Sequence, residues 1–396
     1  MEPIFLYSFL VVISSIIFSS MIYNGSKSIL NLGIIFNVFI VIYGIVGINT
    51  YWFVFNSNLE ILEEIIKVIF ISSIAFNLFF RRTKSLDTLR KVIKTPNNFT
   101  INLLFTIITI SYLGIMLGNE ILFVDRTEAF SLLYQNKYIF LLSSFQIILY
   151  IIIAFNYYIK GKASFFYVAT LCLFFMSILT ISRHDLFAIF VINVFFLLKT
   201  NKMSSSKVMF YSILLLLFFL FFKQILYAQV LGIEYTSVGA DYGEVINWVR
   251  NTVNALNTNI EYEYNPYLVT LEGLFNPFVS SNKPLSNWYM ENLFYQNYLD
   301  GNKYGFSFIG ESYIAGSPYL LIIVFSFYGY LFKKVSFKNV TIVNSVIQII
   351  IILMMYKLFR SESYNFFRSI TWSYLIPLVV IQLFSIFNTH NYKIKS

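Results

Sequence analysis

Long apolar segments follow one another along most of this chain, and short polar stretches separate them. Crossing the hydrocarbon core of a bilayer takes a helix of about 20 predominantly apolar residues, and many of the segments reach that length. Only 12% of the residues are charged, whereas soluble domains carry about 25%. The sequence therefore predicts a polytopic membrane protein, folded as an all-α bundle of transmembrane helices.

We predict about eleven membrane spans along the chain. The first has no basic stretch ahead of it and no small-residue cleavage site, so we expect a retained helix rather than a signal peptide. The seventh is short, and its boundary with the charged residues before it stays open. The predicted spans lie near residues 3–23, 28–49, 62–80, 100–118, 138–158, 164–181, 186–199, 208–228, 311–332, 339–357 and 369–388.

The basic residues of the connecting loops indicate the orientation. With the N-terminus outside and the C-terminus in the cytoplasm, most of the 28 Lys and Arg residues fall in short inside loops. This is the distribution that the positive-inside rule describes. The largest inside cluster lies within 81–94, and Asp87 is the one acidic residue that falls inside.

The segment 229–310 differs from the other connections in length and in composition. It is polar and rich in Asn and Tyr, and its scattered Trp and Phe residues argue against a disordered segment. Residues 241–256 place apolar side chains at helical spacing behind an acidic pair that resembles a capping box. We expect an amphipathic helix there, lying on the membrane surface or capping a cavity. The chain divides into spans one to eight at 1–228, the outer loop at 229–310, and the last three spans with a short tail at 311–396.

Residue types that the chain lacks exclude several chemistries. Its single cysteine, Cys172, rules out an internal disulfide, an iron–sulfur cluster and a Cys-based zinc site. His184 and His390 have no second ligand at metal spacing, and the chain has no phosphate-binding P-loop. The net charge of +9 follows membrane orientation, because the basic residues cluster in short loops. We therefore expect no metal, no cofactor and no nucleic-acid partner.

Three consecutive ionisable residues, Arg183, His184 and Asp185, interrupt two apolar runs. The predicted topology places them at the outer end of spans six and seven. Ionisable groups at membrane depth are costly unless they face a cavity or a partner, so they suggest a functional site. The alternative is a plain outer loop whose charges lie among lipid headgroups.

Glu311 falls at the start of the ninth predicted span, shortly before the small residues Ala315, Gly316 and Ser317. A carboxylate beside small residues that open space can act as a general base or orient an acceptor hydroxyl. We expect Tyr313 to line the same pocket. The alternative is an acid that stabilises the positive end of the helix macrodipole.

Arg360 and Arg368 flank Glu362 in the last predicted outer loop. If that loop is partly helical, the spacing of the two arginines puts both guanidiniums on roughly one face. Guanidinium groups match phosphate oxygens and stay charged, so these two residues and Arg183 are suited to grip a pyrophosphate. The alternatives are snorkelling towards the headgroups or pairing with Glu362.

These features together resemble the bacterial O-antigen and capsule repeat-unit polymerases (Wzy type). The likeness covers the large outer loop before the last three spans and three short motifs: SRHD at 182–185, GESYIAGSP at 310–318 and RSESYNFFR at 360–368. Members are integral membrane glycosyltransferases of the GT-C class. They transfer a growing glycan from undecaprenyl pyrophosphate to a lipid-linked repeat unit, without a nucleotide sugar or an obligatory metal.

The resemblance implies residence in the bacterial inner membrane, a lipid-linked oligosaccharide substrate, contact with membrane lipid and a chain-length regulator as a partner protein. It implies that Arg183 lies in the family's Arg-bearing turn, that Arg360 and Arg368 belong to its basic loop, and that Glu311 is its post-loop glutamate. Related O-antigen ligases carry a His near the start of the stretch that here reads GFSFIGE. The missing His counts against a ligase.

We therefore expect a polysaccharide polymerase. An O-antigen ligase remains an alternative, as do a flippase for lipid-linked oligosaccharides and a receptor or scaffold. A flippase is expected to carry charges at the middle of several spans, and such charges are almost absent. The predicted catalytic residues are Glu311 and Arg183, and the predicted substrate-binding residues are Arg360, Arg368, Tyr313, His184 and Arg250.

Overall fold

The computed structural model confirms the all-α class. Apart from short connections, the described residues are helical, and the exception is a two-residue antiparallel pairing of β1 (Thr95–Pro96) with β2 (Thr389–His390). The predicted span at 208–228 and the basic loop within 81–94 lie almost wholly outside the described residues. The structure describes residues 3–26, 28–80, 95–96, 98–119, 137–161, 164–179, 183–208, 210–211, 239–258, 261–275, 283–296, 305–315, 318–336, 342–386 and 389–390.

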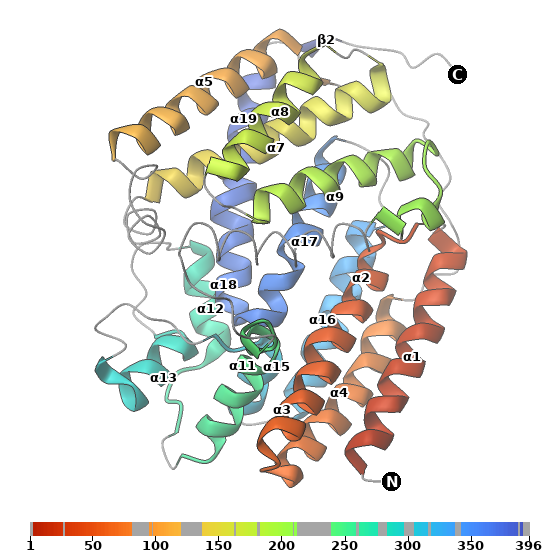
Figure 1. Ribbon diagram of the computed structural model, residues 1–396, viewed down its shortest axis with the longest axis vertical. Helices are drawn as coiled ribbons and strands as arrows, with labels where there is room; N and C mark the ends of the chain where they lie inside the picture. The colour runs from red at the N-terminus through yellow and green to blue at the C-terminus, as the bar shows by residue number, and fades with distance from the viewer. Residues whose placement is uncertain are drawn as a thin grey trace. The chain divides into compact units, whose positions relative to one another are not determined.

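The helices follow in chain order, as Figure 1 labels them. The first half of the chain contains α1 (Pro3–Ser26), α2 (Leu32–Phe39), the π-helix η1 (Ile40–Val46), α3 (Gly47–Phe55), α4 (Leu59–Phe80), α5 (Asn98–Gly118), α7 (Lys137–Lys160), α8 (Ser164–Leu179) and α9 (Arg183–Lys199). The second half contains α11 (Gly239–Leu256), α12 (Pro266–Phe275), α13 (Leu285–Leu293), α15 (Phe308–Ile314), α16 (Pro318–Ser336), α17 (Ile342–Arg360), α18 (Ser363–Arg368), the π-helix η2 (Ser369–Leu375) and α19 (Ile376–Ile386).

Within the described ranges, 7 helices are long and apolar enough to cross a membrane: α1, α2 to α3, α5, α7, α16, α17, and α18 to α19. Large apolar side chains such as Ile16, Ile110 and Ile323 are exposed on these helices. Exposed apolar surface of that extent on apolar helices is typical of lipid-facing positions. The chain is a multi-pass membrane protein.

The predicted total of eleven spans is not confirmed. Helix α4 covers the third predicted span but carries Glu63, Glu64 and Lys67 in its first turns. Helices α8 and α9, at the sixth and seventh predicted spans, have 16 and 17 residues. At about 1.5 Å of rise per residue, such helices are shorter than the roughly 30 Å hydrocarbon core.

The chain divides into two compact units. The first consists of Met1–Asp87, Ser237–Lys338 and Met354–Thr371. In it, α4 packs against both α1 and α16, as Figure 1 shows. Phe36 of α2 lies at the centre of an aromatic core, with its ring stacked on Phe76 at 3.9 Å and tilted against Phe359 at 5.1 Å. Phe308 of α15 packs edge-on against the same Phe359 ring, so the short helix α15 is anchored in the core of this unit.

Amide side chains add specificity to the apolar packing of the first unit. Asn37 of α2 and Asn77 of α4 are both buried, and each amide nitrogen donates to the other side chain's oxygen at 3.0 Å. Hydrogen bonds between apolar helices contribute about 0.6 kcal/mol on average and fix the register of the pair. This amide pair therefore aligns the second and third predicted spans.

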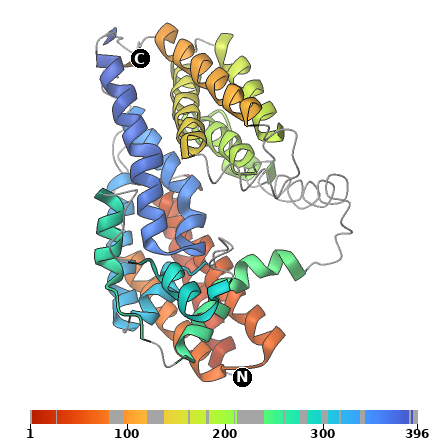
Figure 2. The ribbon, with the colours of Figure 1, turned by 90° about the vertical axis from the view of Figure 1, so that its left-hand side faces the viewer.

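The second unit consists of Thr88–Thr236, Asn339–Leu353 and Trp372–Ser396. Helix α7 packs against α5, α8 and α9, and Figure 2 shows these helices side by side. A polar seam joins three of them. The Tyr150 and Thr170 hydroxyls lie 2.9 Å apart, and Asn193 donates to Tyr150 at 2.8 Å.

The helix predicted at residues 241–256 is confirmed, because α11 covers this range. The Asp241 and Glu244 side chains of the predicted capping box lie outside the described residues. Trp248 and Val249 are buried, because α11 packs against η1 and α3 rather than standing free. Trp248 Nε1 donates to the Tyr43 carbonyl, 2.9 Å away, within the π-helical segment η1. The loop helix is thereby attached to the second predicted span.

One predicted boundary is wrong. The ninth span was expected to begin at Glu311, but Glu311 lies in the separate short helix α15, and the apolar helix α16 begins at Pro318. Proline is favoured in the first turn of a helix and disfavoured in its interior, so Pro318 starts a new helix rather than continuing α15. Glu311 is therefore placed by α15 and not by a membrane span.

Candidate site at a buried carboxylate pair

The short helix α15 holds the candidate site in place. Ser307 is its N-cap, and the Ser307 hydroxyl accepts from the backbone nitrogens of Ile309 and Gly310 at 3.1 and 3.2 Å. Serine is a favoured N-cap because its oxygen satisfies backbone donors that the first turn leaves unpaired. The described side chains of α15 up to Tyr313 are all buried. The Glu311 carboxylate is therefore fixed in the interior of the first unit.

Glu311 is bound by the start of α18. Its Oε2 atom accepts from the backbone nitrogen of Ser363 at 2.9 Å, and the side chain is only 5% exposed. A buried carboxylate is costly unless hydrogen bonds satisfy it, and a backbone donor at a helix start supplies one. Residues 311 and 363 lie far apart in the sequence, so the tertiary fold creates this contact.

Glu362 forms the second half of the pair. It precedes α18, is 1% exposed, and accepts from the Ser286 backbone nitrogen at 3.3 and 3.2 Å through its two oxygens. The Ser286 hydroxyl donates to the same carboxylate, and Asn365 Nδ2 donates to it at 3.4 Å. We call Glu311 and Glu362 the carboxylate pair. It joins α15, α13 and α18 within the first unit.

The surroundings of the carboxylate pair favour the protonated form of Glu311. Burial raises the pKa of Glu311 to about 8, and the negative charge of Glu362 adds to the shift, while Ser363 opposes it. Burial also raises the pKa values of Tyr262 and Tyr267, and the charge of Glu311 contributes to both shifts. A carboxyl group with a pKa near neutrality has the property that a general acid or base requires.

Tyr313 does not share a face with Glu311. Two residues apart on a helix are about 200° apart around its axis. Burial and the nearby Glu64 carboxylate of α4 raise the pKa of Tyr313, which places its hydroxyl near α4. That Tyr313 lines a pocket with Glu311 stays a prediction.

Arg360 and Arg368 belong to two different helices. Helix α17 ends at the exposed Arg360, and α18 ends at Arg368, so no single helix carries both side chains across the Glu362 turn. The argument that their spacing puts both on one helix face therefore does not apply. The Arg368 guanidinium lies over the Tyr364 ring, 5.6 Å from its centroid, in a cation–π contact.

The residues of the SRHD motif belong to the second unit. Helix α9 begins at Arg183, whose side chain lies outside the described residues. His184 Nε2 lies 3.2 Å from the Tyr374 hydroxyl, and Asp185 is buried. The predicted grip of Arg183 on a pyrophosphate, together with Arg360 and Arg368, stays a prediction.

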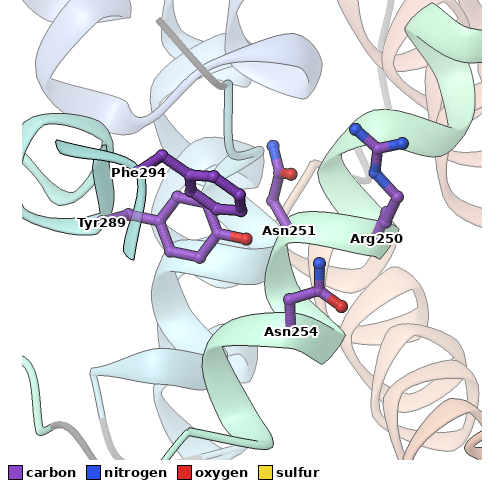
Figure 3. Close-up of a pocket in the computed structure, with 5 residues that line it drawn as sticks. All are labelled: Arg250, Asn251, Asn254, Tyr289 and Phe294. Atoms are coloured by element: carbon purple, nitrogen blue, oxygen red, sulfur yellow. The ribbon is translucent and has the colours of Figure 1, made fainter. Parts of the chain in front are cut away.

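A pocket of about 290 Å³ lies between α11 and α13. Arg250, Asn251 and Asn254 line it from α11, and Tyr289 and Phe294 line it from α13 and the residue after it. In Figure 3 the Tyr289 hydroxyl is turned towards the α11 side chains. Arg250, predicted from the sequence to bind substrate, thus lies in a pocket, although no sequence signal marked its neighbours.

Glu362 and Ser286 were missed as site residues at the sequence level. From the sequence, Glu362 is a candidate partner for the flanking arginines, and nothing distinguishes Ser286 from other loop serines. The Ser-Glu-Ser stretch between two apolar segments is a signal that could have identified Glu362. A glutamate held between two apolar helices needs hydrogen-bond donors if its carboxylate is buried. Its partner cannot be found from one sequence.

The apolar helices define a multi-pass membrane protein, and the segments between them enclose a buried pair of carboxylates. The chain matches no known protein-family model, no curated protein and no solved structure. Among the described residues, no three His, Cys, Asp or Glu side chains lie close enough to hold a metal ion.

Proposed function

We propose that this protein is a membrane glycosyltransferase of the polysaccharide-polymerase type, acting on lipid-linked repeat units in a bacterial inner membrane. The observation that carries the proposal is Glu311, a buried carboxyl with a pKa of about 8 that lies next to a second carboxylate. The multi-pass membrane fold supports it, because a lipid-linked substrate must be met at the bilayer.

In the proposed reaction, a hydroxyl of the acceptor repeat unit attacks the anomeric carbon of the donor glycan. The bond from that carbon to the undecaprenyl pyrophosphate oxygen breaks, and the leaving group departs with the electron pair. Ionised Glu311 takes the proton of the attacking hydroxyl. Glu362 keeps the pKa of Glu311 high, which makes the ionised form a stronger base than an exposed glutamate.

Positive charge is needed where the leaving group departs, because the developing charge on the pyrophosphate is the main barrier. Arg360 is exposed at the end of α17, two residues from Glu362, and we assign it to the pyrophosphate. Arg368 is held by Tyr364 in the same segment and is assigned as the second cation. The proposed partners are a lipid-linked oligosaccharide, membrane lipid and a chain-length regulator.

The first test is the surface glycan of a strain that lacks the protein, separated by size on a gel. Loss of the long ladder, with a single repeat unit still on its surface anchor, is the expected result. Loss of every band with undecaprenyl-linked polymer accumulating favours a ligase. Single repeats trapped inside the cell favour a flippase. Either of the last two outcomes overturns the proposal.

Glu311→Gln tests the residue that carries the proposal. The variant keeps the size of the side chain but cannot take a proton, so polymer should fall by about 100-fold or more at matched protein level in the membrane. Glu263→Gln is the matched control, because Glu263 is an exposed glutamate in a neighbouring described segment. A full ladder from Glu311→Gln contradicts the assignment of Glu311 as the base.

A further inference from the structure

The pocket between α11 and α13 has two chemically different walls. One wall is aromatic, with the Tyr289 and Phe294 ring centroids 5.5 Å apart at an interplanar angle of 48°. The other wall is polar and comes from three residues of α11, which are Arg250, Asn251 and Asn254. Figure 3 shows the two walls facing each other.

The aromatic wall is firmly supported. Tyr289 is buried and packs edge-on against Phe306, with ring centroids 5.0 Å apart. Phe294 is half-buried beside it. On the opposite side, Asn251 is buried and donates to the Gly305 carbonyl at 2.8 Å, whereas Asn254 and Arg250 are exposed. Tyr289 and Asn251 are therefore the fixed backing of the pocket, and Phe294, Asn254 and Arg250 are the lining side chains that a ligand can reach.

This combination suits a sugar ring. A pyranose presents an apolar C–H face that packs on aromatic rings, and its edge carries hydroxyls that both donate to and accept from amides. The volume of about 290 Å³ is at the lower end of ligand pockets, which is room for one ring rather than a long chain. The five lining residues include one cation and no acid, so an acidic substituent on the sugar finds its counter-charge in Arg250.

The pocket is connected to the carboxylate pair through shared elements. Helix α13 provides Tyr289 to the pocket and, one turn earlier, Ser286 to Glu362. Helix α11 provides Asn251 to the pocket and, as the next residue, Thr252 to the contact with Gly310 beside Glu311. Gly305, which accepts from Asn251, packs against the Arg360 carbonyl. A glycan bound in the pocket is therefore held by the same helices that position the proposed base.

We propose that this pocket is a subsite for one uronic-acid ring of the glycan, with the ring on Phe294, which Tyr289 backs, the hydroxyls on Asn254 and the carboxylate on Arg250. The inference rests on the proposed function, because it makes the pocket a part of the same transferase. It goes beyond that function by naming the chemical class of a sugar that the protein recognises.

The test uses the full-length protein in detergent and saturation-transfer difference NMR, which detects weak binding of small sugars. The probes are the methyl glycosides of glucuronic and galacturonic acid, with those of glucose and galactose for comparison. At least one uronide should bind, about tenfold more tightly than its neutral counterpart. Arg250→Gln should remove that tenfold preference, since a charge-assisted hydrogen bond contributes about that much.

Matched variants separate the pocket from general effects on folding. Asn254→Ala should weaken binding of the uronide, whereas Asn247→Ala, an exposed asparagine of the same helix outside the lining, should not. Phe294→Ala should weaken it too, with the exposed neighbour Tyr295→Ala as control. Equal binding of uronide and neutral glycoside, equal binding by Arg250→Gln and wild type, or no binding of any probe overturns the proposal.

The subsite and the transferase fail in different ways. Glu311→Gln should bind the uronide as the wild type does while its polymer yield falls by about 100-fold or more. If the polymer ladder survives deletion of the protein but uronide binding is confirmed, the transferase proposal fails and the saccharide site stands. If the ladder depends on the protein but no probe binds, the subsite proposal fails and the transferase stands.

Discussion

At the scale of single residues, Glu311 shows how two neighbouring acids acquire different roles. Both carboxylates of the pair are buried, but Glu362 receives three donors from Ser286 and Asn365, whereas Glu311 receives its donors from Ser363. Hydrogen bonds to a carboxylate favour its charged form. Glu362 is therefore the better-bonded carboxylate, and Glu311, whose pKa burial raises to about 8, is the one that we propose exchanges a proton.

The raised pKa of Glu311 has a consequence for stability that can be measured. Its carboxyl group titrates near 4.5 when unfolded and about 8 when folded. The unfolded chain therefore loses the proton first as pH rises, and the stability present below pH 4.5 declines up to about pH 8. Glu311→Gln cannot ionise and should escape this decline.

We expect Glu311→Gln to gain stability relative to the wild type as pH rises from 4.5 to 8, by up to about 1.4 kcal/mol for each pH unit. Thermal unfolding in detergent, followed by tryptophan fluorescence at several pH values, measures the difference in stability between Glu311→Gln and the wild type. Glu263→Gln, at an exposed glutamate, is the control variant. If the difference in stability between Glu311→Gln and the wild type does not change between pH 4.5 and 8, Glu311 is ionised over that whole range and its pKa is not raised.

At the scale of elements, the packing of α15 against α11 determines where Glu311 lies. Gly310 faces Thr252 so closely that a methyl group added at Gly310 would collide with the Thr252 hydroxyl. That hydroxyl is held in turn by a hydrogen bond to the Trp248 carbonyl at 2.7 Å. Only a residue without a side chain permits this approach, and the neighbouring Glu311 is positioned by it.

Gly310→Ala should destabilise the protein by about 1–3 kcal/mol, because an overpacked contact forces backbone shifts. Thr252→Ala should rescue part of the loss in the double variant by removing the colliding hydroxyl. Gly114→Ala is the control, since nothing lies within 4 Å of that position in α5. Thermal unfolding of the four proteins provides the comparison, and a harmless Gly310→Ala would show that α15 does not depend on this contact.

The break between α15 and α16 shows where periodicity misleads. Residues 311–332 read as one mostly apolar run, and such a run predicts a continuous span. The residues Gly316, Ser317 and Pro318 carry the opposing signal, because glycine and proline interrupt helices. Giving that local signal more weight than overall hydropathy would have separated Glu311 from the span.

At the scale of the whole molecule, hydropathy predicted the class of protein because lipid imposes one strong constraint, which is long apolar helices. Most helices lie within a few residues of the predicted spans, as with α5 at Asn98–Gly118. The candidate site was predictable only in part. Glu311 was identified from its local sequence, but its pairing with Glu362 and the pocket at Tyr289 depend on contacts between segments that one sequence does not reveal.

The predicted orientation can be tested through the single cysteine of the chain. In a Cys172→Ser background, Glu263→Cys should react with a membrane-impermeant maleimide added to spheroplasts, because the outer loop is predicted to face outside. Lys334→Cys, at the basic end of α16, should react only after permeabilisation. The reverse labelling pattern would invert the predicted topology.

The contact of Trp248 with the Tyr43 carbonyl ties a segment between spans to a helix that lies in lipid. Transmembrane helices adjust their tilt to the thickness of the surrounding bilayer. Because α11 is fastened to η1, a change in the tilt of the α2 to α3 helix is transmitted to Arg250, Asn251 and Asn254 on the same loop helix. We therefore expect the width of the pocket to depend on lipid composition, through the thickness of the bilayer.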